Sequence, residues 1–181
     1  RALLQNQLEE NAIANFETGI NAAILNTAVL RGIFGVQPQS AFGYSMGEVS
    51  MAFSLGVWES TDKMSSILHS DPLFQERLAG SMDAARELWG LGRADQKKDQ
   101  SIWECYTVAA SAEEIEALIA DKKHVYILII NSPHELVIAG ETQAVREVVK
   151  SIDHQCTLTP MSDTIHCEVV KSEYGYGIHH K

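Results

Sequence analysis

The sequence predicts an α/β protein with two subdomains, and two observations carry this prediction. The first is a serine between two glycines in the stretch GYSMGEVSM (43–51), which stands between a strand candidate and a helix candidate. The second is a β-α-β-β-α-β order of predicted elements over residues 102–161. With 181 residues, the chain is long enough for one domain, or for one domain that carries a small inserted subdomain.

The first part of the chain is dominated by helical spacing. Apolar residues recur at this spacing over residues 10–34, which predicts one long, well-buried helix or two helices that abut near Gly19. Residues 40–44 are short and apolar enough for a buried strand, and helical spacing resumes after Gly47. Ser45 therefore stands in the strand-turn-helix context that a nucleophile elbow requires.

Two further helices are predicted before a polar linker. The pattern of residues 60–70 predicts a short helix. Asp71-Pro72 is typical of an N-cap followed by proline at the first helical position, and it predicts a second helix that runs to about Leu91. Residues 92–101 are polar and have no apolar period, so we expect the boundary between the subdomains there.

The pattern changes after this linker and predicts a small subdomain. The strand-like segments are 102–111, 124–131, 135–140 and 155–161, and the helical segments are 112–123 and 142–152. Their order is that of a ferredoxin-like subdomain. We therefore predict three parts: residues 1–101 with the serine turn, residues 102–161 as the small subdomain, and residues 162–181 as a return to the larger one.

Composition argues against several classes of partner. The net charge is −10 and no dense basic block occurs, so nucleic acid is not an expected partner. Cys105, Cys156 and Cys167 have no CxxC spacing and fit neither a disulfide framework nor a zinc site, so we expect no metal and a reducing, cytoplasmic setting. No apolar run reaches the roughly 18 residues that a membrane span needs.

Taken in order, the motifs resemble the acyltransferase domain of fatty-acid and polyketide synthases, the malonyl/acyl-CoA to acyl carrier protein transferases. The matching stretches are Gly43-Tyr44-Ser45-Met46-Gly47-Glu48 for the family's G-H-S-x-G-E, Leu55-Gly56-Val57 for its A-G-V turn, Asn131-Ser132-Pro133 and Val137-Ile138-Ala139-Gly140 for its N-x-P and V-x-x-G, and His166-Cys167 for its catalytic histidine. The stretches GYSMGEVSM, GVW and IHCEVVKSEY look most like the acyltransferases of polyunsaturated fatty acid synthases and related glycolipid synthases. The resemblance implies an α/β-hydrolase-like large subdomain, present in part, with the ferredoxin-like subdomain inserted in it.

The resemblance also implies a Ser-His dyad that works through an acyl-serine ester. Ser45 would be the nucleophile and His166 its general base, with the imidazole oriented by backbone carbonyls. The backbone N–H of Met46 would donate to the oxyanion at the start of a helix. No cofactor is expected to stay bound, because acyl-CoA is the donor and the phosphopantetheine thiol of an acyl carrier protein is the acceptor. Other domains of a synthase multienzyme are the further expected partners.

Part of the family's pattern has no counterpart in this chain. The family's second oxyanion donor comes from a Gln-containing turn near the amino terminus, and the carboxy-terminal part of the large subdomain is also not found. The resemblance therefore indicates a fragment, whose own activity stays open.

Three positions bear on the substrate. Tyr44 replaces the family's histidine before the nucleophile, and Asn131 belongs to the N-x-P motif. Ser70 stands 25 residues after Ser45, where malonyl-type members carry an arginine that pairs with the free carboxylate, and Arg77 comes seven residues later on another predicted helix. Without a guanidinium, a malonyl carboxylate would be left unpaired, so we predict selectivity for uncharged acyl groups.

Two other functions remain open at this point. Water entering before the carrier thiol would make the same dyad a thioesterase or esterase, although a full α/β-hydrolase would not carry a β-α-β-β-α-β insertion. The departures at Tyr44 and Ser70 also leave open a non-catalytic docking domain of a multienzyme. The identity of the acyl chain, the parent polypeptide and the oligomeric state are not determined by these residues.

Overall fold

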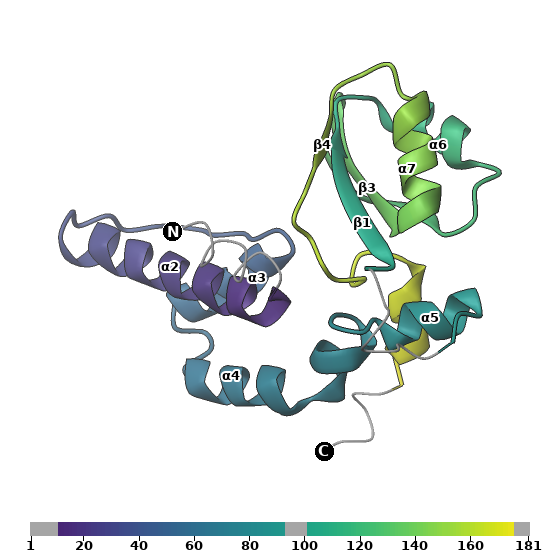
Figure 1. The fold of residues 1–181 in the computed structure, drawn as a ribbon. Coiled ribbons are helices and arrows are strands. Elements are labelled where there is room, and N and C mark those ends of the chain that lie inside the picture. The colour runs from purple at the N-terminus through teal and green to yellow at the C-terminus, as the bar shows by residue number, and fades with distance from the viewer. Residues whose placement is uncertain (1–10, 93–100, 176–181) are drawn as a thin grey trace, which may run out of the picture. The chain divides into compact units, whose positions relative to one another are not determined.

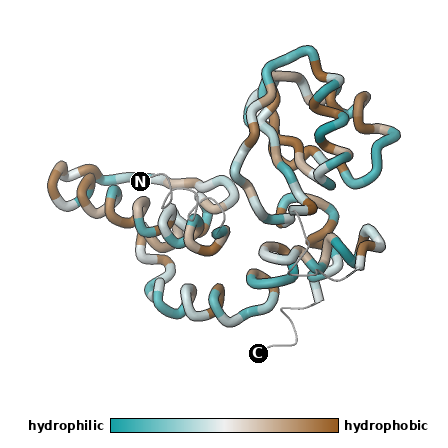
Figure 2. The backbone as a smooth tube through the Cα atoms, in the orientation of Figure 1, coloured by the Kyte–Doolittle hydropathy of each residue, from teal (hydrophilic) through white to brown (hydrophobic). Residues whose placement is uncertain are grey.

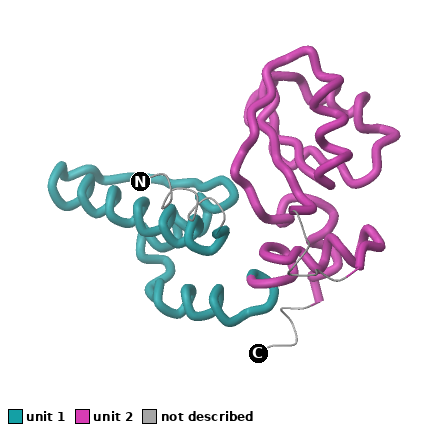
Figure 3. The backbone as a smooth tube through the Cα atoms, in the orientation of Figure 1, with its two compact units in different colours: residues 1–74 teal, residues 75–181 magenta. Residues whose placement is uncertain are grey.

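The structure, a computed structural model, describes residues 11–92 and 101–175. The chain divides into two compact units, Arg1–Phe74 and Gln75–Lys181 (Figure 3). Residues 93–100, which make up most of the predicted linker, lie outside the described residues. The predicted subdomain boundaries at 101/102 and 161/162 therefore stay a prediction.

Three α-helices build the described part of the first unit: α2 (Ala12–Gly32), α3 (Met46–Ser54) and α4 (Thr61–Ser70) (Figure 1). α2 is continuous over 21 residues, so of the two predicted alternatives the single long helix is the one observed, without a break at Gly19. The prediction that this helix is well buried was wrong, because only Ile13 and Ile20 are buried on it. The Asn11 side chain caps α2 by accepting a hydrogen bond of 3.0 Å from the Ala14 N–H. α2 and α3 pack against each other, and Ile20 is fully buried.

The first unit leaves many apolar side chains exposed. Figure 2 shows hydrophobic segments along α2, yet Leu25 on this helix is 64% exposed, and Ile33 and Phe34 just after it are exposed as well. Residues 40–44 form no strand, so this prediction was wrong. A strand obtains its backbone hydrogen bonds from a neighbouring strand, and no strand occurs in the described part of this unit. Phe42 is 94% exposed as a result.

The predicted helix from Asp71 to about Leu91 is broken in the middle. Asp71 does act as a cap, since its Oδ1 accepts a hydrogen bond of 2.9 Å from the Leu73 N–H. A π-helical turn η1 (Leu73–Arg77) follows, and the α-helix α5 (Asp83–Trp89) begins only after Gly80 and Met82 have taken left-handed backbone angles. A Cβ at Gly80 would overlap the carbonyl of Gln75, so the chain turns at this glycine.

The second unit contains the predicted ferredoxin-like subdomain, and this prediction is confirmed. Its strands are β1 (Trp103–Val108), β2 (Val125–Ser132), β3 (Glu135–Glu141) and β4 (Cys156–Leu158), and its helices are α6 (Ala112–Ile119) and α7 (Thr142–Ser151). The sheet has the order β2-β3-β1-β4 and every pair is antiparallel. Both helices cover the same face of the sheet (Figure 1).

The core of this subdomain lies between that face and the two helices. Its fully buried members come from strands and helices alike: Val108, Ile115, Leu136, Ile138 and Val145. Burial of this kind is worth roughly 1.5–3 kcal/mol for each large aliphatic side chain. The subdomain therefore buries its apolar residues with its own elements.

Residues 75–92 and 162–175 pack within the second unit. The Thr164 N–H donates to the Leu78 carbonyl over 2.9 Å, which brings together segments 86 residues apart. α5 contacts the 3₁₀ helix η2 (Glu168–Glu173). Trp89, the last residue of α5, stacks on Trp103 of β1 and donates its Nε1–H to the Tyr126 hydroxyl over 3.0 Å. These contacts join residues 162–175 to residues 75–92, and Trp89 joins residues 75–92 to the small subdomain.

None of the helices in the described part of the chain combines the length and the apolar character needed to cross a bilayer.

Candidate active site

Ser45 has an unusual backbone conformation. It is the residue before α3, its φ is 53° and its ψ is −123°, and its side chain is exposed. A positive φ is uncommon for a residue other than glycine, and such conformations cost on the order of 1–3 kcal/mol. They occur at functional sites, and the nucleophile elbow is one of them, because its sharp turn projects the serine oxygen outward. The backbone at Ser45 thus supports the elbow expected from the sequence.

The two glycines of the motif have different roles. A Cβ at Gly43 would overlap the backbone of Gly47 and Glu48, so this position must be glycine for the turn to close. A Cβ at Gly47 would meet no atom within 4 Å. The turn itself is held by a hydrogen bond of 2.8 Å from the Gly47 N–H to the Tyr44 carbonyl.

The start of α3 follows the serine directly. Met46 is the first residue of this helix, and amides of a first turn have no helical carbonyl to which they can donate. The helix dipole adds partial positive charge at the same place. The position of Met46 therefore suits the oxyanion donor predicted from the sequence. Tyr44, on the other side of Ser45, is 64% exposed.

Ser70 is the last residue of α4 in the same unit. Its hydroxyl donates to the Ser66 carbonyl over 2.7 Å, and the residue is exposed. A serine in this position can offer no charge to a substrate carboxylate.

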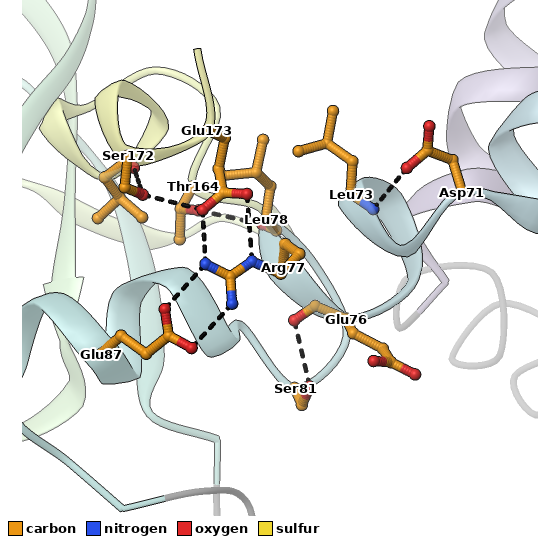
Figure 4. A network of polar contacts seen from close by, with 11 residues as sticks. Asp71, Leu73, Glu76, Arg77, Leu78, Ser81, Glu87, Thr164, Ser172 and Glu173 are labelled. Carbon is orange, nitrogen blue, oxygen red and sulfur yellow. Dashed lines mark hydrogen bonds and ion pairs between the residues drawn. The ribbon is translucent and has the colours of Figure 1, made fainter. Parts of the chain in front are cut away.

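Arg77, the arginine seven residues after Ser70, is held by two carboxylates of the second unit (Figure 4). Its Nε and Nη2 donate to Glu173 over 3.1 and 2.6 Å, and its Nη1 and Nη2 donate to Glu87 over 2.9 Å each. Glu173 is only 6% exposed, and hydrogen bonds from Arg77 lower the pKa of its carboxyl. The guanidinium of Arg77 is thus committed to a structural ion pair.

His166 lies in a half-buried turn before η2, in the second unit. The carboxyl of Asp163 interacts with it electrostatically, and Asp163 Oδ1 accepts a hydrogen bond of 3.2 Å from the Ile165 N–H. Burial raises the pKa of Asp163, while the charge of His166 acts in the opposite direction. The sequence reasoning expected backbone carbonyls alone around His166, and it missed this carboxylate three residues upstream. Ser45 and His166 belong to different units, so their pairing stays a prediction.

The thiols of Cys167 and Cys105 are poor nucleophiles. Burial raises the pKa of Cys167 to about 11 and that of Cys105 to about 12. Since the thiolate is the reactive form, both groups are essentially inactive at neutral pH. Within residues 11–92 and 101–175, no group of three or more His, Cys, Asp and Glu side chains is arranged to hold a metal ion.

Asn131 lies near the end of β2, exposed, in the second unit. Its Nδ2 donates to Glu135 Oε1 over 3.1 Å across the β2–β3 hairpin. This contact supports the hairpin, and a role of Asn131 toward substrate stays a prediction.

An apolar cavity of about 610 Å³ in the first unit was not predicted from the sequence. Val49 and Phe53 of α3, Trp58, and Ile67 and Leu68 of α4 are among the residues that line it. Val49 is the fourth residue of α3, the helix that begins directly after Ser45. The spacing of Val49 and Phe53 was the signal that could have indicated an apolar face there.

No protein-family model matches the chain, whereas curated sequences and solved structures do. A polyunsaturated fatty acid synthase subunit from Thraustochytrium sp. is 32% identical over an alignment of 178 residues, which covers 94% of this chain and 9% of that relative. The acyltransferase domain of a phenolphthiocerol/phthiocerol synthase from Mycobacterium bovis (BCG) matches with a TM-score of 0.63 at 23% identity. That match covers 91% of this chain and 55% of the solved one.

A third match comes from a type II polyketide synthase acyl carrier protein in complex with its malonyl transacylase. Its TM-score is 0.63 at 19% identity, and it covers 92% of this chain and 50% of the matched chain. The present chain thus spans less than a tenth of the curated relative and about half of the solved domains. By its sequence relation to a polyunsaturated fatty acid synthase and by its fold, the chain is part of an acyltransferase domain of the fatty-acid and polyketide synthase family.

Proposed function

We propose that the chain is part of an acyltransferase that moves an uncharged acyl group from acyl-CoA to an acyl carrier protein through an ester on Ser45. The observation that carries this proposal is the positive φ of Ser45 at the start of α3, within G-x-S-x-G. A strained backbone at this place is expected if the serine oxygen must meet substrate, and it has no use in a plain turn.

The chemistry then runs in two transfers. Ser45 Oγ attacks the thioester carbonyl while His166 takes its proton, and the resulting oxyanion accepts a hydrogen bond from the Met46 N–H. The C–S bond breaks, and the departing CoA thiolate takes the proton from His166. In the second transfer the carrier thiol gives its proton to His166, its sulfur attacks the acyl-serine, and Ser45 Oγ regains the proton.

Two observations support an uncharged acyl group. Ser70, at the end of α4, brings no charge, and Arg77 is bound by Glu87 and Glu173. The cavity between α3 and α4 is lined mainly by apolar side chains. A carboxylate among these apolar side chains would lose its hydration at a cost of several kcal/mol, except where it reached the ammonium of Lys63, which also lines the cavity.

The carrier protein and the multienzyme belong to the same proposal. One matched structure holds a malonyl transacylase with its acyl carrier protein, and the sequence relative is part of a synthase. We expect the phosphopantetheine arm of a carrier protein as acceptor, neighbouring synthase domains as covalent or bound partners, and a cytoplasmic setting for fatty acid or polyketide-type lipid synthesis.

Intact-protein mass spectrometry tests the proposal on the complete acyltransferase domain that contains this chain. The domain is incubated with acetyl-, malonyl- and long-chain acyl-CoA in turn, and the Ser45→Ala variant is the control. We expect a mass gain from the uncharged donors that is absent in the variant, with much less loading from malonyl-CoA. A matched Ser70→Arg variant should gain malonyl loading.

The other outcomes separate the competing functions. Preferential malonyl loading would contradict the selectivity and leave the acyltransferase in place. Rapid CoA release without an adduct would indicate a thioesterase, and neither adduct nor CoA release would indicate a docking domain.

A further inference from the structure

We propose that Gly19 of α2 is a positioning residue for the nucleophile elbow, because it provides the space in which the Met46 side chain is seated. This inference rests on the proposed function, in which the Met46 N–H donates to the oxyanion. It concerns a residue that lies 26 positions before the nucleophile and outside the G-x-S-x-G motif.

The contact between Gly19 and Met46 is close. A Cβ added at Gly19 would lie 2.6 Å from Met46 Cε and 3.0 Å from Met46 Sδ. Both distances are shorter than a van der Waals contact between such atoms, which is about 3.5–4.0 Å. Any side chain at position 19 would therefore push the end of the Met46 side chain out of its present place.

Helix propensity alone would not select glycine here. Gly19 stands in the interior of a continuous 21-residue helix, where alanine is the favoured small residue. Gly32, in the last turn of the same helix, has nothing within 4 Å of an added Cβ. The two glycines differ in what they face, so Gly32 is a matched control for Gly19.

The seat at Gly19 supports one side of a strained turn. A residue such as Ser45, with a φ of 53°, keeps its conformation only if its surroundings determine it. On the amino-terminal side, Gly43 packs so closely on the backbone of Gly47 and Glu48 that no Cβ would fit between them. On the carboxy-terminal side, Met46 ties the first residue of α3 to α2 through its side chain. Its backbone N–H is then held where the oxyanion forms.

The atoms that would move are the far end of a flexible thioether, so the fold should tolerate a small residue at position 19. This separates a positioning role from a purely structural one. A structural role predicts a loss of stability in a Gly19 variant. A positioning role predicts a folded, stable variant that forms the acyl-serine more slowly at saturating donor, with little change in KM.

Four variants of the complete domain test the inference: Gly19→Ala, Gly19→Leu, Gly32→Leu and the double variant Gly19→Leu/Met46→Ala. We expect Gly19→Leu to lower the acylation rate constant about 10-fold or more, since loss of a whole oxyanion donor lowers kcat roughly 100- to 1000-fold. Gly19→Ala should have a smaller effect in the same direction. Gly32→Leu should acylate as the wild type does, and the double variant should be no faster than Gly19→Leu, because it lacks the Met46 side chain that anchors α3 to α2.

An NMR readout keeps this test independent of acyl transfer. The Met46 amide and methyl resonances should shift in Gly19→Ala and stay unchanged in Gly32→Ala. Equal acylation rates in Gly19→Leu and Gly32→Leu would overturn the inference. If wild-type domain forms no acyl-serine, the proposed function fails, and unshifted Met46 resonances would then overturn the seat at Gly19 separately.

Discussion

The two units of the chain differ in how far they bury their apolar side chains. The ferredoxin-like part of the second unit buries Ile115, Ile138 and Val145 completely between its own sheet and helices. The described part of the first unit contains three α-helices and leaves Phe42 and Leu25 largely exposed. The strained serine lies in the first unit, whereas the regular sheet lies in the second. The comparison indicates that the small subdomain is determined by its own residues, while the elbow region depends on more than its own helices.

Truncation of a buried side chain in the sheet should give the largest change in stability that tests this difference. We expect Ile138→Ala to lower the free energy of unfolding of the second unit by about 4 kcal/mol, because it leaves a cavity in a closed core. Leu25→Ala on α2, where the side chain is 64% exposed, should change stability by about 0.5 kcal/mol or less. Urea unfolding monitored by circular dichroism measures both. A large effect of Leu25→Ala in the complete domain would show that α2 is covered there.

The Arg77 network allows a second test, within the second unit. Glu173→Gln leaves the Arg77 guanidinium with a weaker partner in a buried place, so we expect a loss of about 3 kcal/mol. Glu87→Gln acts on the exposed end of the same arginine, where the carboxylate side chain is 65% exposed, and should cost about 1 kcal/mol or less. Thermal unfolding of the two variants side by side gives the ratio of their stability losses. Equal losses would contradict the assignment of Glu173 as the buried anchor.

The pH dependence of stability should have opposite signs at Glu173 and Asp163. The pKa of Glu173 is lowered by Arg77, so its stabilising contribution is present above the ordinary pKa of 4.5 and is lost as the pH falls through the lowered value. The pKa of Asp163 is raised by burial, so its ionisation destabilises the folded state as the pH rises above its ordinary 3.8.

Denaturant unfolding between about pH 3 and pH 7 measures both pH dependences of stability. The stability difference between wild type and Glu173→Gln should shrink toward the acidic end of this range. Asp163→Asn should be at least as stable as wild type at neutral pH, with the advantage disappearing at the acidic end. A stabilising carboxylate at Asp163, seen as lower stability of Asp163→Asn at neutral pH, would contradict the raised pKa.

The smallest expected effect concerns the two glycines of α2. Gly32→Ala should stabilise the first unit by up to about 1 kcal/mol through helix propensity, because its added Cβ meets no neighbour. Gly19→Ala should gain less than this, since the same propensity is opposed by displacement of the Met46 side chain. The difference in melting temperature between the two variants measures that displacement. A larger gain in Gly19→Ala would show that the contact with Met46 carries no energy.

Much of the chain could be predicted because it depends on neighbours in the sequence. The alternation of apolar residues specified the β-α-β-β-α-β order, and the helical spacing specified α2, α3 and α4. The prediction was wrong where contacts outside the local hydrophobic pattern decided the outcome. Residues 40–44 had the composition of a strand and found no neighbouring strand in the described part of their unit, and Gly80 interrupted a helix because the chain closes onto Gln75.

By itself the sequence determined the order of elements and the place of the G-x-S-x-G motif, since both follow from local spacing and composition. Only the tertiary structure decided the positive φ of Ser45, the carboxyl of Asp163 beside His166, and the pairing of Arg77 with Glu173, 96 residues away. The Ser45 backbone and the interaction of Asp163 with His166 depend on the conformation of short turns that residue type alone does not specify, whereas the Arg77 pairing depends on which distant groups the fold brings into contact. The same holds for Gly19, which is an unfavourable helix residue in the sequence and a seat for Met46 in the fold.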